Sequence, residues 1–140
     1  MTQYQTFAAP LGRLLLALIF IMAGAQKITG YAGNQAYMEM MGVPGILLPL
    51  VILTELGGGI ALLLGWQARM VAFLLAGFSV LSGLIFHFIP SLALDGMEAQ
   101  MQMISFMKNL SIAGGMLMIV ALGGGAFSLG RRQPLAYPAE

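Results

Sequence analysis

The 140-residue chain has no cysteine, one histidine and few charged residues, and these scarcities exclude several classes of protein. Without cysteine there is no disulfide, thiol redox relay, iron–sulfur cluster or cysteine-based zinc site. One histidine cannot supply both axial imidazoles of a bis-histidine haem. Six Lys and Arg against five Asp and Glu give a formal net charge of +1, so no basic surface for nucleic acid is expected.

The chain is instead rich in apolar residues, which make up 59% of it, whereas only 8% of its residues are charged. Soluble domains carry about 25% charged residues. This composition predicts an integral membrane protein.

Four apolar runs are long enough to cross a bilayer, whose core of about 30 Å needs about 20 helical residues. They cover about 7–26, 46–65, 70–89 and 107–127. The loops between them are short, so neighbouring helices should pack antiparallel. We predict a single domain over residues 1–140, an all-α four-helix transmembrane bundle.

The first run has two interpretations. Arg13, an apolar run over 14–22 and the small residues 23–25 imitate a signal peptide with its cleavage site. A helical stripe favours a retained first helix instead, and it consists of Arg13, Ala17, Phe20, Gly24 and Lys27.

Basic residues predict the orientation in the membrane. With four crossings, the side of both termini holds Arg13, Arg69, Arg131 and Arg132. The other side holds Lys27 and Lys108 together with Glu39, Asp95 and Glu98. By the positive-inside rule, both termini should be cytoplasmic.

Glycines cluster inside the apolar runs rather than at strand-to-helix turns, so they are not phosphate-binding loops. Small residues let membrane helices approach closely. Gly57, Ala61 and Gly65 form one such face at a spacing of four. The glycines expected at close helix contacts are Gly24, Gly57, Gly58, Gly59, Gly83 and Gly115.

Glu55 lies near the middle of the second run, where an ionised side chain costs roughly 2.5 to 3.5 kcal/mol. It should therefore face protein. The carboxyl either accepts protons or binds a ligand, or else it forms a structural pair with a basic residue. The sequence does not choose among the partners Arg13, Lys27, His87 and Lys108.

The other polar side chains of the apolar runs gather toward the outer half of the bundle. His87 follows Ser79 and Gly83 at a spacing of four, and Lys108 with Asn109 opens the fourth run. Converging polar groups predict a cavity that opens outward. The candidate ligand-binding residues are Glu55, Lys27, His87, Lys108, Asn109 and Arg13.

The outer loops carry two further signals. Residues 34–41 predict a short interfacial helix that ends at Gly42 and Pro44. Methionines near the fourth run could bind Cu(I) together with His87, but thioethers more often fill apolar gaps. We therefore predict no metal site at Met97, Met101, Met103 and Met107.

Several motifs together resemble the DoxX family of small bacterial inner-membrane proteins. They are AGAQKITGYAG, YMEMMGVPG, TELGGGIALLLG and FMKNLSIAGG, followed by GAFSLGRR. The resemblance runs from about Leu11 to Arg132. Matching positions are Arg13, Gly24, Lys27, Gly30, Glu55, Gly58, Gly59, His87, Lys108 and Asn109.

This resemblance implies a four-helix inner-membrane protein. The family takes its name from a quinol oxidase subunit, and some relatives are linked to thiosulfate–quinone or oxidative-stress complexes. The expected function is an accessory or quinone-facing subunit of a membrane redox system, with quinone as the ligand and other redox subunits or a second copy as partners in the bilayer. The alternatives are a small-solute or ion permease and a structural partner protein without its own activity. Whether the chain is an enzyme stays open.

Overall fold

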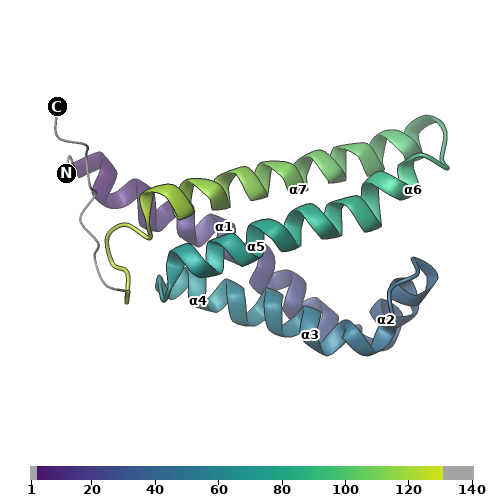
Figure 1. Cartoon of the computed structure of the whole chain (residues 1–140), viewed down its shortest axis with the longest axis horizontal. Helices are drawn as coiled ribbons and strands as arrows, with labels where there is room; N and C mark the ends of the chain where they lie inside the picture. The colour runs from purple at the N-terminus through teal and green to yellow at the C-terminus, as the bar shows by residue number, and fades with distance from the viewer. Residues whose placement is uncertain (1–2, 131–140) are drawn as a thin grey trace.

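The computed structural model describes residues 3–130, and every regular element in that range is helical. Four stretches are long and apolar enough to cross a membrane (Figure 1): Thr6–Thr29, Gly45–Leu64, Ala68–Ser91 and Gly96–Leu122. The predicted all-α four-helix membrane bundle is confirmed.

The first and fourth spans are single helices, and the two middle spans are interrupted. α1 covers Gln3–Thr29 and α7 covers Gly96–Leu122. The second span consists of η1 (Gly45–Leu47), α3 (Leu48–Ile52), η2 (Leu53–Gly57) and α4 (Gly58–Leu64). The third consists of α5 (Ala68–Gly83), η3 (Leu84–Phe88) and α6 (Ile89–Ser91). η1 is a 3₁₀ turn, whereas η2 and η3 are single π-helical turns.

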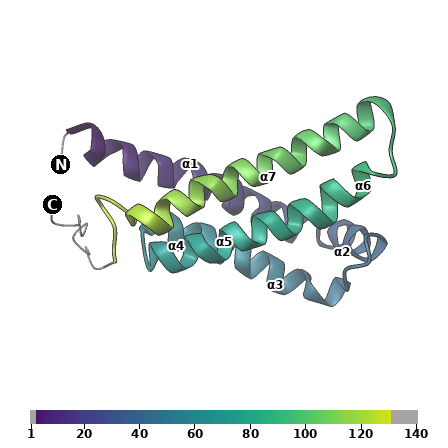
Figure 2. The ribbon, with the colours of Figure 1, turned by 45° about the horizontal axis from the view of Figure 1, so that its top comes forward.

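The two ends of the bundle differ in structure. α1 begins, and α7 ends, at one end of the molecule, which we call the termini end (Figure 1). The short helix α2 (Tyr31–Met40) and α6 lie at the opposite end, which we call the α2 end. α5 and α7 run side by side along most of the bundle (Figure 2).

Apolar packing is concentrated in the half nearer the termini end. Its buried core consists of Ala17, Phe20, Leu62, Val71, Ala72, Leu75, Ala76, Ala113 and Met116. The predicted α1 stripe is part of this interior, since Arg13, Ala17 and Phe20 are all at most 5% exposed. A retained first helix therefore has a packing role in the bundle.

Glycines bring α1 and the second span into close contact. A Cβ on Gly24 would lie 2.9 Å from the backbone nitrogen of Leu56, and one on Gly59 would lie 2.8 Å from Ile21 Cγ1. Other interfaces follow the same rule: Gly58 faces Leu75, Gly83 faces Asn109 and Gly115 faces Leu16. Among these glycines, backbone atoms of the facing helix lie close only at Gly24 and Gly59, and there the close approach favours a residue without a side chain.

The predicted face of Gly57, Ala61 and Gly65 does not form as expected. The only atom near a Cβ on Gly57 would be Leu53 of its own turn, at 3.5 Å. Gly65 caps α4 in the left-handed conformation, with φ +70°. The face therefore starts at the last residue of η2 and ends at the C-cap of α4, and Gly57 has no neighbouring helix against it within 4 Å.

The fourth helix ends earlier than the apolar run predicts, at Leu122. Gly123 has φ +88°, a conformation that ends the helix, and 123–130 is a non-helical segment. This segment folds back over the end of α4, because Leu129 N donates to Leu64 O at 3.0 Å and Ser128 Oγ donates to Gly65 O at 2.7 Å. The termini end is thereby covered.

The helix predicted at 34–41 is present as α2. It follows α1 after a break at Gly30, and Gly42 with φ +79° comes directly after its last turn. The predicted stop is therefore confirmed. α2 is more than an interfacial connector, because Met38 is only 4% exposed and packs against the bundle.

Candidate functional site

A buried ion pair joins α1 to the second span. Lys27 Nζ lies 2.9 Å from Glu55 Oε2 and donates a hydrogen bond to Oε1 at 3.1 Å. The Glu55 side chain is 8% exposed and that of Lys27 is 24% exposed. Of the four basic residues considered from the sequence, the structure pairs Lys27 with Glu55. Each charge thus offsets the cost of the other in an apolar environment.

The carboxylate of Glu55 keeps acceptor capacity beside the ion pair. Its Oε2 atom lies 2.9 Å from the Lys27 ammonium, and because each carboxylate oxygen has two lone pairs, the ion pair does not use all of them. Glu55 lies in the π turn η2, and such turns often occur at functional sites. A ligand hydroxyl in the cavity would donate to one of the remaining lone pairs.

The ion pair borders a cavity of about 490 Å³ in the α2 half of the bundle. Its volume is within the range of about 300 to 1,000 Å³ that is usual for small-molecule sites. Most of the wall is apolar. The polar side chains in it are those of Lys27, Asn34, Tyr37, Thr54, Glu55, Ser79, Ser82, His87 and Asn109.

His87 lies on the cavity wall in the second π turn, η3. Its Nδ1 atom is 2.7 Å from Gln102 Oε1 on α7. With the Gln102 amide oriented so that its oxygen faces the ring, Nδ1 is the donor in this contact. In the neutral ring, Nε2 then remains as an acceptor.

Comparison with known proteins agrees with this fold. The family profile described as DoxX matches residues 8–88, more than half of the chain. The chain belongs to the DoxX family. Within it, the chain is 50% identical over 119 residues to inner membrane protein YqjF of Escherichia coli (strain K12), covering 85% of this chain and 86% of YqjF.

A second DoxX-like relative is inner membrane protein YphA of the same strain, 34% identical over 124 residues, with 87% of each chain covered. No solved structure matches the chain. The relatives and the four spans identify this DoxX-family chain as a multi-pass inner-membrane protein. The segment matched by the profile contains Lys27, Glu55 and His87, and α7 adds Asn109 to the cavity from outside it.

In this DoxX-family bundle, Arg13 lies apart from the cavity and binds backbone carbonyls. Its Nη1 atom donates to Gly124 O and, at 3.4 Å, to Ala126 O. Its Nη2 atom donates to Leu63 O at 3.2 Å and to Phe127 O at 2.9 Å. The structure therefore does not bring Arg13 to Glu55, and the guanidinium instead ties 123–130 to the end of α4.

Lys108 and Asn109 are adjacent on α7, but only Asn109 lines the cavity. Lys108 is exposed and does not line the cavity. Asn109 lines the cavity and donates one amide hydrogen to Ser105 O at 3.1 Å, which leaves a second hydrogen available. Of this pair, the structure brings only Asn109 to the candidate site.

The residues weighed as copper ligands, for which the sequence predicts no metal site, differ in their surroundings. His87 faces the cavity, whereas Met97, Met101, Met103 and Met107 are each at least 36% exposed. No group of three or more metal-ligating His, Cys, Asp or Glu side chains occurs within residues 3–130. The absence of a metal site stays a prediction.

Sequence reasoning missed the contribution of α2 to the site. Asn34, Tyr37 and Met38 all line the cavity, and Tyr37 stacks on Phe86 of η3 with ring centroids 5.7 Å apart. Their spacing of three and four residues places them on one helix face. That periodicity was a usable signal, but it did not reveal which element the face contacts.

Proposed function

We propose that this DoxX-family protein binds a quinone in the cavity lined by Lys27, Glu55, His87 and Asn109. It would do so as an accessory subunit of an inner-membrane redox system. The observation that supports this is a buried ion pair, Lys27 with Glu55, on the wall of a largely apolar cavity. A quinone ring suits such a site, because its carbon atoms pack against the apolar wall and its two oxygens form hydrogen bonds with the polar side chains.

The polar groups suit both redox forms of the ring. Lys27 and Asn109 present hydrogen-bond donors, which a carbonyl oxygen accepts. Glu55 Oε2 and His87 Nε2 present acceptors, which suit hydroxyl groups. A bound quinone supplies the redox chemistry. The residues of this chain bind the ring, and Glu55 takes up or releases a proton.

The alternative function of a small-solute or ion permease requires a path through the whole bundle. The apolar core fills the half nearer the termini, and segment 123–130 covers that end. This arrangement, which closes the bundle toward the termini end, favours binding over conduction.

We expect quinone to copurify with the protein in mild detergent, at about one molecule per chain. Mass spectrometry of the extracted lipids, quinones, metals and associated proteins measures this directly. Asn109→Ala should reduce the bound quinone because it removes a donor from the cavity wall. Lys108→Gln is the matched control on the neighbouring residue and should retain it, because Lys108 does not line the cavity.

A quinone content no higher than that of an unrelated membrane protein purified in parallel would contradict the proposal. Equal loss of quinone in the Asn109 and Lys108 variants would contradict the placement of the site.

We also propose that both termini are cytoplasmic. Arg13 and Arg69 lie on the segments nearer the termini end, while Arg131 and Arg132 fall outside the described residues. A reporter active only in the cytoplasm, fused after Glu140, should be active, and one active only in the periplasm should be active when inserted near Asp95. The reverse pattern, or a mature chain beginning near Gln26, would refute this topology and the retained first helix.

A further inference from the structure

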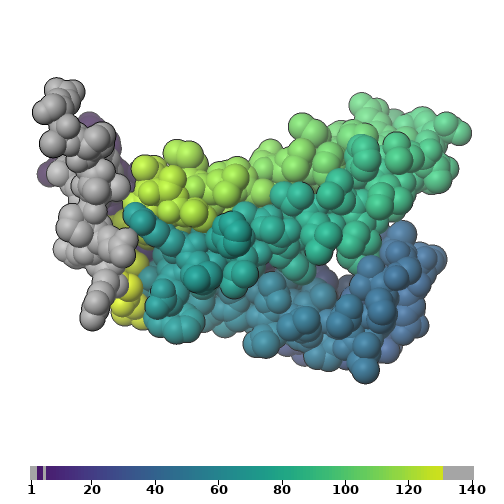
Figure 3. Space-filling model, viewed as in Figure 1, coloured from purple at the N-terminus to yellow at the C-terminus, as the bar shows by residue number. Residues whose placement is uncertain are grey.

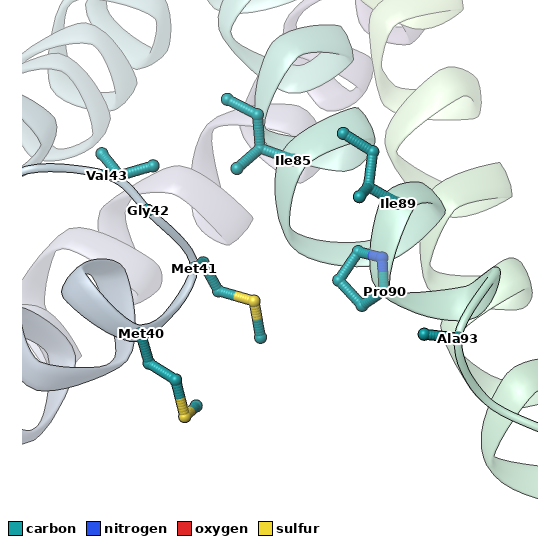
Figure 4. A pocket seen from close by; sticks show the side chains of 8 residues that line it. All are labelled: Met40, Met41, Gly42, Val43, Ile85, Ile89, Pro90 and Ala93. Carbon is teal, nitrogen blue, oxygen red and sulfur yellow. The ribbon is translucent and has the colours of Figure 1, made fainter.

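A second hollow lies at the α2 end of the bundle. Met40, Met41, Gly42 and Val43 form one side of it, and Ile85, Ile89, Pro90 and Ala93 form the other (Figure 4). Its volume is about 460 Å³. The space-filling view shows a notch at this end, between the segment around α2 and the segment around α6 (Figure 3). We call this hollow the methionine groove.

The methionine groove adjoins the Lys27–Glu55 cavity. Val43 and Ile85 line both spaces, so these two side chains form the boundary between them. In Figure 4, the side chains of Met41 and Pro90 point toward one another from the two sides of the groove. The polar site and the groove therefore adjoin one another across Val43 and Ile85.

The groove lies where the third span ends, since Ile85, Ile89 and Pro90 belong to that span and the other five lining residues lie outside the four spans. Ile85 lies six residues before Ser91, the last residue of the third span, which is about 9 Å along a helix. Ile89 is 58% exposed and Met40 is 71% exposed, so the groove is open at its outer side. Its opening consequently faces lipid chains or the membrane interface.

The chemistry of the groove selects an apolar occupant. None of its eight lining residues has a charged side chain or a side-chain hydrogen-bond donor. Methionine side chains are flexible and adapt to irregular apolar shapes. A polar solute would gain no hydrogen bond from these side chains, whereas a hydrocarbon chain would be removed from contact with water at the interface.

We infer that the methionine groove is the lipid-side entrance of the cavity and holds the single apolar tail of a ligand whose headgroup binds at Lys27 and Glu55. The tail passes between Val43 and Ile85, along Met41 and Pro90, and out into the bilayer. This inference rests on the proposed function for the headgroup and adds that the ligand is a tailed, lipid-soluble molecule entering from the membrane.

The test uses two probes with the same headgroup, a tail-free ubiquinone analogue and decylubiquinone, and the protein in lipid nanodiscs. Ala93→Trp places a large ring in the groove at an exposed position. We expect it to raise the Kd of decylubiquinone at least tenfold and to change the Kd of the tail-free probe less than twofold. Comparing variant with wild type for each probe cancels the partitioning of the tailed probe into lipid.

Leu117→Trp is the matched control, since it adds the same ring at an exposed position on α7 that lines neither space. It should change neither Kd. A second groove variant, Met41→Trp, should reproduce the selective effect of Ala93→Trp. Agreement between the two variants shows that the effect does not come from local misfolding at one position.

The outcomes separate the two proposals. If the wild type binds both probes and the groove variants weaken both equally or neither, the entrance and tail site are refuted while the headgroup site stands. If the wild type binds neither probe, the proposed function fails and the inference fails with it.

Discussion

Replacing Glu55 with Gln is expected to lower the thermal stability of the protein in detergent and to empty its cavity of quinone. The amide is nearly isosteric, so the fold is retained, but the Lys27 ammonium loses its counter-charge. Removing one partner of a fully buried pair costs about 3 to 5 kcal/mol. We expect a smaller loss here because the Lys27 side chain keeps 24% of its exposure.

A double variant separates structure from ligand binding. Glu55→Gln combined with Lys27→Met removes both charges, so most of the lost stability should return, measured as the unfolding midpoint in a thermal scan. Quinone binding should not return, because both polar groups are missing. If the pair were only structural, the double variant would bind as much quinone as the wild type.

The control for this series is Glu39→Gln, which makes the same chemical change at an exposed carboxylate of α2. It should leave the unfolding midpoint and the bound quinone within experimental error. A Glu55→Gln protein with both wild-type stability and full quinone content would contradict both roles assigned to the ion pair.

Replacing Arg13 with Met is expected to be the most destabilising single change in the chain. The guanidinium donates to four backbone carbonyls, and hydrogen bonds to charged groups contribute about 1.5 to 3 kcal/mol each. Arg13 is 4% exposed, so its acceptors would be left without partners in an apolar region. Segment 123–130 should detach from α4, which limited proteolysis detects as new cleavage within it.

Arg13→Lys should recover only part of this stability. A single ammonium lacks the planar fork with which Arg13 reaches Gly124 through Nη1 and Leu63 through Nη2. Cleavage in 123–130 should be intermediate between that of wild type and that of Arg13→Met. Full recovery of stability with Arg13→Lys would show that the positive charge alone secures the termini end. No loss of stability with Arg13→Met would show that neither the charge nor the geometry of Arg13 secures it.

The sequence by itself determined the class of protein and the number of membrane spans. These follow from local properties, because the length of an apolar run and its helical periodicity do not depend on what a helix contacts. The stripe from Arg13 to Phe20 is buried as its spacing predicts. The cost of a charge in the membrane likewise placed Glu55 toward protein, without naming its partner.

Only the tertiary structure decided which polar groups meet. Lys27 and Glu55 are 28 residues apart, and Arg13 and Gly124 are 111 residues apart, so both contacts depend on how the helices cross. The π turns that contain Glu55 and His87 change the helical register, and no spacing rule for an ordinary helix anticipates them. The cavity arises from four spans and α2 together, and the methionine groove arises from residues 40–43 and the end of the third span. A hollow is a property of packed elements and not of any one segment.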